Sequence, residues 1–124
     1  MLNEPIKSYR DLRVWQEAMS LAEACYFVTK TFPREEVFGM TSQIRRSAAS
    51  IPANIAEGYG RESTGAYLQF LKTAQGSLKE LETHLLLAVR VEIVPEASIE
   101  PILQRCQDAG KMLRGLMRSI TKEQ

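Results

Sequence analysis

Apolar residues recur along most of the chain at alternating spacings of three and four positions, the pattern of one face of an α-helix. The most regular line comprises Leu71, Ala74, Leu78, Leu81, Leu85 and Ala88. Such a line is buried when helices pack against one another with their apolar faces inward. No segment shows the alternation of a half-buried β-strand, so the sequence predicts an all-α protein.

Four segments with this spacing predict helices at roughly 9–31, 41–58, 64–92 and 97–121. The other expected core lines are Leu12, Trp15, Met19, Ala22 and Tyr26 in the first helix, Ile44, Ala48, Ile51 and Ile55 in the second, and Ile99, Ile102, Cys106, Ala109, Leu113, Leu116 and Ile120 in the fourth. Short connections make each helix return beside the preceding one. We therefore expect an up-down-up-down antiparallel four-helix bundle, formed by residues 1–124 as a single domain.

Residues with capping chemistry indicate where these helices begin and end. The expected N-terminal caps are Ser8 with Asp11 as a capping box, Thr41, and Ser63 or Thr64. Gly58 and Gly60 are expected to end the second helix, since glycine adopts the left-handed closing conformation without strain.

Pro52 lies in the middle of the second expected helix. Proline has no N–H to donate to the carbonyl group of Ala48, and its ring crowds the preceding turn. The sequence therefore predicts that this helix is kinked at Pro52.

A second, polar line follows the same helix about 100° away from its apolar line. It consists of Gln43, Ser47, Ser50, Asn54 and Glu57, and it ends at Arg61, placed for an i,i+4 ion pair with Glu57. Ala49, Ala53 and Ala56 lie beside it and are small enough for close approach of a partner. One interpretation is a helix that only wraps its own bundle. The other is a contact face, which makes Gln43, Ser47, Ser50, Asn54 and Glu57 candidate subunit-interface residues.

The residue types that carry enzyme chemistry are sparse. A di-metal bundle needs a Glu-x-x-His pair on facing helices, but Leu81 stands three residues before the only histidine, His84. Glu80, four residues before His84, is expected to form a structural or solvated pair with it. Neither a phosphate-binding glycine loop nor cysteine–histidine metal spacing occurs. We expect a non-enzyme with no catalytic residue, cofactor or metal, and two buried free thiols at Cys25 and Cys106.

The formal net charge is +1, so any electrostatic binding must come from a local patch or from repetition in an oligomer. A polar-to-basic line off the apolar line of the fourth helix forms such a patch: it comprises Gln104, Gln107, Lys111, Arg114 and Arg118, with Lys122 one turn further on. Its basic residues can serve as cations that favour a helix C-terminus, or as contacts to nucleic-acid phosphates. Both interpretations stay open.

The chain begins with the polar segment "MLNEPIKSYR", and its longest apolar run is "LLLAV" at 85–89. That run is far too short to span a bilayer. We expect a cytoplasmic protein without membrane contact.

Three segments resemble a known family: "DLRVWQEA" at 11–18, "FPREEVFGMTSQIRRSAASIPANIAEGYGR" at 32–61 and "FLKTAQGSLKELETHL" at 70–85. Together they resemble the four-helix bundle proteins encoded in intervening sequences of bacterial 23S ribosomal RNA genes. The resemblance covers nearly the whole chain. The family name describes a gene location and does not make the protein a ribosomal component.

The resemblance implies a bundle subunit that assembles as a ring-like homopentamer. Related proteins accompany reverse transcriptases in diversity-generating retroelements, where a basic barrel surface is the suggested contact with nucleic acid. Basic residues that match the family motif are Arg45, Arg46 and Arg61. With Lys111, Arg114 and Arg118 they are the candidate nucleic-acid contacts.

These observations favour a non-enzymatic homo-oligomer that binds RNA, another nucleic acid or a nucleic-acid-processing partner similar to a reverse transcriptase. The alternative is a protein–protein adaptor or structural assembly protein without nucleic-acid binding.

Overall fold

The structure is a computed structural model that describes residues 5–122, which contain helices and no strands. The four long helices are α1 (Arg13–Thr29), α2 (Met40–Tyr59), α3 (Thr64–Arg90) and α4 (Glu96–Lys122). Two short 3-10 helices, η1 (Tyr9–Asp11) and η2 (Arg34–Glu36), precede α1 and α2. The chain is therefore the four-helix bundle that its sequence predicts.

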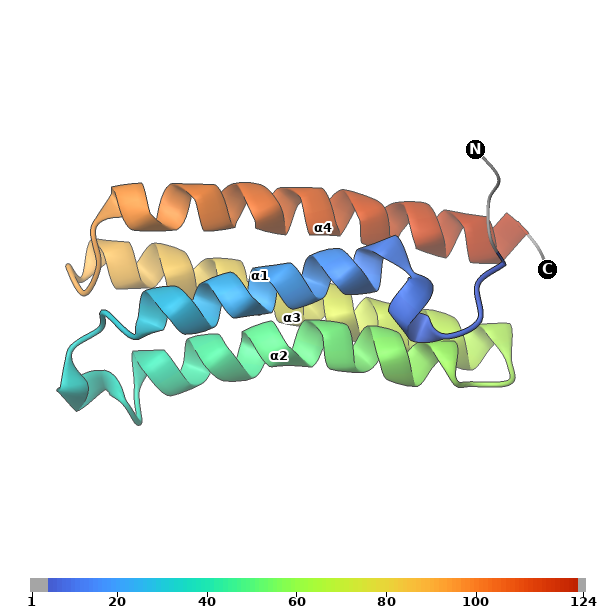
Figure 1. Ribbon diagram of the computed structural model, residues 1–124, viewed down its shortest axis with the longest axis horizontal. Helices are drawn as coiled ribbons and strands as arrows, with labels where there is room; N and C mark the ends of the chain where they lie inside the picture. The colour runs from blue at the N-terminus through green and yellow to red at the C-terminus, as the bar shows by residue number, and fades with distance from the viewer. Residues whose placement is uncertain (1–4, 123–124) are drawn as a thin grey trace.

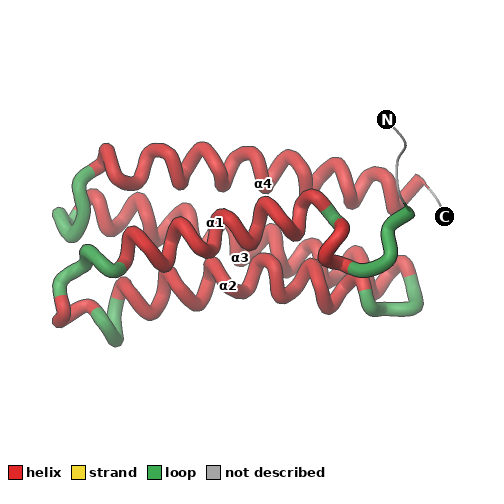
Figure 2. Tube along the Cα trace, in the orientation of Figure 1, coloured by secondary structure: helices red, strands yellow, loops and turns green. Residues whose placement is uncertain are grey.

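The helices lie side by side, and Figure 1 shows that the chain direction alternates from each helix to the next. Each helix packs against two others: α1 and α3 each contact α2 and α4. The connections gather at the two ends of the bundle, as the green segments of Figure 2 show. The η2 segment and the α3–α4 turn lie at one end, and the C-terminal end of α4 lies at the other.

The expected core lines of α2 and α3 are confirmed. All four residues of the α2 line are 0% exposed, and the six residues of the α3 line are at most 1% exposed. The line of α4 is buried from Ile99 to Ile120 except Leu116, which is partly buried against the core.

The core line expected for α1 is wrong at two of its positions. Met19 and Tyr26 are 39% and 43% exposed. The apolar residues that α1 buries deepest are Val14, Ala18, Leu21 and Cys25, a second line with the same helical spacing. The sequence carries two apolar lines on this helix, and packing against α2 and α4 turns the second one inward.

Two of the expected helix starts need correction. Ser8 and Asp11 do form a capping box, but it caps η1. Leu12 then takes an extended conformation, so α1 begins at Arg13. Thr41 is not a cap, because α2 begins at Met40 and buries Thr41. Ser63 caps α3 as predicted, its hydroxyl accepting from the Ala66 N–H at 3.1 Å.

The glycines at the end of α2 do not adopt the expected left-handed conformation. Gly58 matters instead because it has no side chain. Gly60 has a φ of −78°, and no described glycine has a positive φ. A Cβ atom at Gly58 would lie 2.8 Å from the Cβ of Phe70 and 3.3 Å from the carbonyl oxygen of Tyr67. Gly58 therefore allows α2 and α3 to approach closely at this point. Pro52 is buried within α2, and the kink expected there stays a prediction.

Candidate nucleic-acid interface

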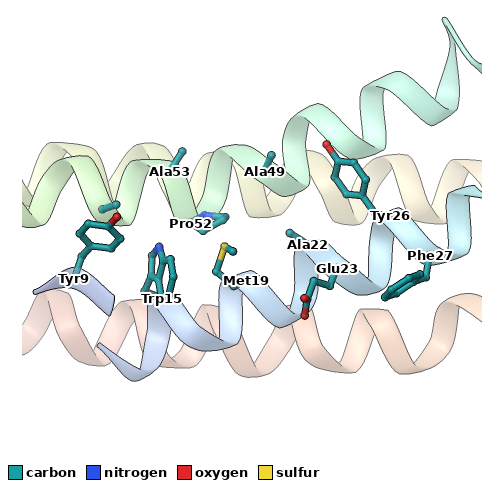
Figure 3. A pocket seen from close by; sticks show the side chains of 11 residues that line it. Tyr9, Trp15, Met19, Ala22, Glu23, Tyr26, Phe27, Ala49, Pro52 and Ala53 are labelled. Carbon is teal, nitrogen blue, oxygen red and sulfur yellow. The ribbon is translucent and has the colours of Figure 1, made fainter. Parts of the chain in front are cut away.

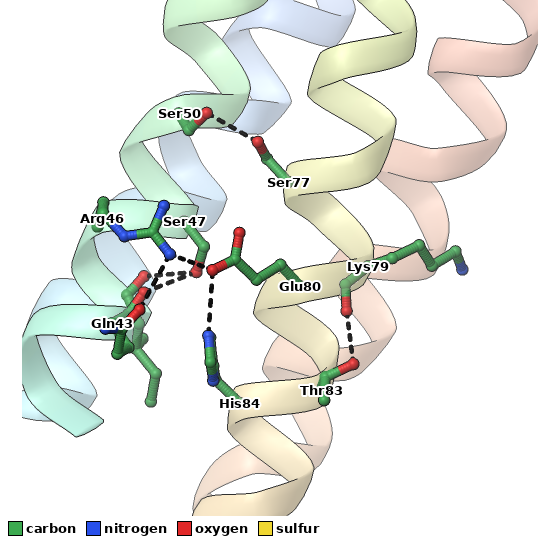
Figure 4. Close-up of polar contacts among 10 residues, drawn as sticks. Gln43, Arg46, Ser47, Ser50, Ser77, Lys79, Glu80, Thr83 and His84 are labelled. Atoms are coloured by element: carbon green, nitrogen blue, oxygen red, sulfur yellow. Dashed lines mark hydrogen bonds and ion pairs between the residues drawn. The ribbon is translucent and has the colours of Figure 1, made fainter. Parts of the chain in front are cut away.

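The middle of the polar line of α2 forms hydrogen bonds within its own chain, and Ser50 contacts α3 directly. The hydroxyl groups of Ser50 and Ser77 are 2.7 Å apart, and the amide of Asn54 donates to the Ser50 carbonyl at 2.8 Å and to its hydroxyl at 3.0 Å. Figure 4 shows the Ser50–Ser77 contact bridging the two helices. These groups therefore find hydrogen-bond partners inside the subunit.

Ser47 must be removed from the expected subunit interface. Its side chain is 0% exposed, and its hydroxyl donates to the Gln43 carbonyl at 2.9 Å. A side chain enclosed in its own bundle offers no surface to another subunit. Gln43 and Glu57 are exposed, and Ser50 and Asn54 are half-buried.

Arg46 and His84 both contact the carboxylate of Glu80. Arg46 forms an ion pair with Glu80 and donates to the side-chain oxygen of Gln43 at 2.9 Å, while Nε2 of His84 lies 3.3 Å from Glu80 (Figure 4). The hydrogen bond from His84, together with that from Arg46, holds the pKa of Glu80 below its ordinary value of 4.5. The expected Glu80–His84 pair is thus present and extends to α2.

Arg45 and Arg61, the other two arginines of the family motif, also contact their own chain. The guanidinium of Arg45 lies 4.8 Å from the Tyr26 ring centre, and its Nε donates to the Thr29 hydroxyl at 2.8 Å. Arg61 lies 4.7 Å from the Phe70 ring centre and forms the expected pair with Glu57, at 4.0 Å. All three motif arginines thus have partners within the subunit.

The basic residues of α4, unlike Arg46 and Arg61, form no ion pair within the described chain. Lys111, Arg114 and Arg118 are exposed, and none of them forms an ion pair with any residue of the described range 5–122. Every charged residue from 111 to 122 is basic. This half of α4 therefore presents cations whose charge no described side chain neutralises.

Helix α3 adds a further cation that sequence reasoning missed. Lys72 of α3 and Arg118 and Lys122 of α4 line one hollow with a volume of about 380 Å³, whose remaining lining is Leu68, Met117 and Thr121. We call Lys72, Lys111, Arg114, Arg118 and Lys122 the basic face. No signal in the sequence links Lys72 to α4, because only the α3–α4 packing brings them to one hollow.

A second surface feature is an apolar groove between α1 and α2, with a volume of about 530 Å³. It is lined by Trp15, Met19, Ala22, Tyr26 and Phe27 of α1, by Ala49, Pro52, Ala53 and Ala56 of α2, by Tyr9, and by one charged residue, Glu23. Figure 3 shows Trp15 and Met19 rising from α1 toward Pro52, with Glu23 at the α1 edge. The alanines expected to admit a partner therefore line this groove.

The described residues hold no group of three or more His, Cys, Asp or Glu side chains able to bind a metal ion. Cys25 and Cys106 are free and buried as predicted, and burial raises the pKa of the Cys25 thiol to about 12. None of the helices described between residues 5 and 122 combines the length and apolarity needed to cross a membrane.

Comparisons with known proteins agree with this architecture. The family model described as 23S rRNA-intervening sequence protein matches residues 10–115. The chain is also similar to the crystal structure of a protein with unknown function from the S23 ribosomal protein family of Bacteroides thetaiotaomicron, with a TM-score of 0.75 and 26% sequence identity, over 84% of this chain and 97% of that one. A search of curated proteins finds no match.

Proposed function

The chain belongs to the 23S rRNA-intervening sequence protein family, and from this premise we propose that it is a non-enzymatic, cytoplasmic homo-oligomer that binds RNA through the basic face. The observation that carries the proposal is the set of exposed cations on the C-terminal half of α4, which have no acidic partner in the described chain. Cations held this way can each neutralise a phosphate without first breaking an internal ion pair.

The shape of the basic face also suits a phosphate backbone. Lys72 approaches from α3 while Arg118 and Lys122 approach from α4, so charge lies on both sides of the hollow. Arg118 can contact a phosphate with two parallel hydrogen bonds, and the lysines act as point charges. A negatively charged strand placed along this hollow would be contacted from two helices.

A single chain with a net charge of only +1 would bind RNA weakly, and repetition of the basic face in an oligomer would strengthen that binding. Each subunit would supply one basic face, and several faces binding one RNA act with a high effective concentration. The motif arginines contribute less in this proposal, because Arg45, Arg46 and Arg61 are engaged with Tyr26, Glu80 and Phe70 of the same subunit.

The test is RNA binding measured by fluorescence anisotropy over a series of salt concentrations, with a 23S rRNA fragment and an unrelated RNA of equal length. The double variant Arg114→Gln/Arg118→Gln should bind more weakly to both RNAs and lower the salt slope by about 1.4 per bound subunit, at roughly 0.7 per single-strand phosphate contact. The control Lys79→Gln/Arg90→Gln removes the same charge from the exposed side of α3. Equal weakening by both variants, or no binding by the wild type at low ionic strength, would overturn the proposal.

The adaptor alternative is favoured by the apolar groove between α1 and α2, since exposed apolar surface of this kind marks protein contacts. Under that alternative the protein assembles with itself or another protein but binds no RNA at any salt concentration. The same anisotropy series separates the two functions.

A further inference from the structure

Phe38 is the most exposed of the large apolar side chains in the described chain. It is 93% exposed, and its neighbour Val37 is 49% exposed. Both follow η2 in the connection between α1 and α2. We call Val37 and Phe38 the knob. The two neighbouring side chains leave an aromatic and an aliphatic group together in water, and aromatic side chains are enriched where proteins contact one another.

The knob is held outward by a structured connection. The N–H groups of Glu36, Val37 and Gly39 donate to carbonyl groups three residues earlier, at 2.9, 3.1 and 3.0 Å. The carboxylate of Glu36 also accepts from the Met40 N–H at 3.0 Å. A side chain presented on such a frame loses little conformational freedom when it binds, which favours affinity.

The same chain carries a matching hollow. The apolar groove pairs large side chains of α1 with alanines of α2, and Ala49 and Ala53 are exposed on its α2 side. Its volume of about 530 Å³ leaves room for an aromatic ring with a flanking valine. The groove does not receive its own knob, because Phe38 is not part of its lining and stays in solvent.

Charge points to a second copy of this chain as the occupant. Glu23 is the only charged residue among those that line the groove. Arg34 stands beside the knob in η2, is exposed, and forms no ion pair within residues 5–122. A knob that enters the groove of another copy brings the unpaired cation of Arg34 toward the unpaired carboxylate of Glu23. Glu35, also exposed in η2, must point away from Glu23 for this contact to be favourable.

We propose that the knob of one subunit inserts into the apolar groove of the next, with Arg34 pairing across the junction with Glu23. The inference rests on the homo-oligomer of the proposed function and names its contact surface. Knob and groove are different parts of one chain, so the junction is head-to-tail, and repeating it closes a ring or extends a filament.

The first test is Phe38→Ala, with Leu87→Ala as the matched control. Leu87 is 44% exposed on α3 and belongs to neither knob nor groove. Phe38→Ala should weaken self-association measured by light scattering about tenfold or more, the loss typical of a central aromatic anchor. Leu87→Ala should assemble as the wild type does. Thermal melting should show both variants folded, since neither side chain is buried.

A charge exchange tests whether the contact joins two chains. Glu23→Arg and Arg34→Glu should each weaken association, and the double variant should restore it. Mixing the two single variants should restore association between unlike chains, because each knob then meets a groove of opposite charge on the other chain. In a ring with an odd number of subunits, at least one junction still joins two like variants.

The outcomes separate this junction from the wider proposal. An assembled wild type with an equally assembled Phe38→Ala, or a Glu23→Arg/Arg34→Glu double variant that associates no better than the two single variants, would overturn the junction alone. A wild type that stays monomeric at high protein concentration would overturn both the junction and the homo-oligomer. Arg114→Gln/Arg118→Gln, which leaves knob and groove intact, should assemble normally while binding RNA weakly.

Discussion

Helix α2 meets its two neighbours in opposite ways. Toward α3 it presents polar groups, and Ser50, Asn54 and Arg46 all find partners within the subunit. Toward α1 it presents small apolar residues, and the groove there is left open with Met19 and Tyr26 partly exposed. Ser50, Asn54 and Arg46, which look functional in the sequence, therefore bond within the subunit. By contrast, Met19 and Tyr26, which look like core residues, line an open groove.

The contrast shows how a folded chain uses polar and apolar residues. A polar group at a helix–helix contact must find a hydrogen-bond partner, and the nearest supply is the adjacent helix. An exposed apolar groove cannot be satisfied by a hydrogen bond to a neighbouring helix. Covering it with another protein removes apolar surface from water, which is favourable. The open groove is thus a better indicator of a protein-binding surface than the polar line of α2.

The largest expected effect tests which line of α1 faces the core. Leu21→Ala should lower the free energy of unfolding by about 2–5 kcal/mol, because Leu21 is 0% exposed and its loss leaves a cavity. Met19→Ala should lower it by less than about 1 kcal/mol, since that side chain is already partly in water. Urea denaturation of both variants measures the difference. Equal losses would restore the core line first expected from the sequence.

The next effect concerns the close approach of α2 and α3. Gly58→Ala places a Cβ atom 2.8 Å from Phe70 and should destabilise the fold by about 1–3 kcal/mol. Gly76→Ala in α3 meets nothing within 4 Å and should instead stabilise it by up to about 1 kcal/mol. Thermal unfolding compares the two. A harmless Gly58→Ala would show that the helices separate easily there.

A smaller effect measures the hydrogen bonding on the polar side of α2. Ser50→Ala removes the partner of the Ser77 hydroxyl and one acceptor of Asn54, and should cost about 1 kcal/mol. Ser50→Ala/Ser77→Ala should cost less than the sum of the two single changes. Strict additivity in a denaturation-based double-mutant cycle would contradict the coupling.

The smallest effect is the pH-dependent contribution of Glu80 to the free energy of unfolding. Its pKa is lowered from 4.5, so the charged carboxylate stabilises the fold above that pH, and the stabilisation is lost as the pH falls through the lowered pKa. Glu80→Gln should cost less than about 1 kcal/mol at neutral pH, because the pair is partly exposed, and close to nothing in stronger acid. Glu100→Gln, an exposed carboxylate on α4, is the control for urea denaturation at both pH values. A pH-independent difference would contradict the assignment.

Much of the fold could be predicted because the helical lines of α2, α3 and α4 each offer a single apolar face. Leu78 and Leu81 of α3 and Ile51 and Ile55 of α2 have no competing line, and all are at most 1% exposed. Ser63 was predictable as a cap because capping is a local hydrogen bond between residues close in sequence.

The candidate site was less predictable, because charge and spacing do not reveal which side chains are already paired. Arg46 and Arg114 look alike in the sequence, but only the packing of α2 on α3 brings Glu80 to Arg46. Lys72 was missed for the same reason, since its relation to Arg118 depends on how α3 and α4 meet.

Local periodicity and composition were thus enough to specify an all-α four-helix bundle, most of its core and its modest net charge. Tertiary packing decided which of two equally spaced lines on α1 is buried, which polar groups of α2 are used up inside the subunit, and where cations and apolar groups stay open. The reason is physical: helical periodicity is encoded by residues three and four apart, whereas burial and pairing depend on neighbours that only the assembled bundle supplies.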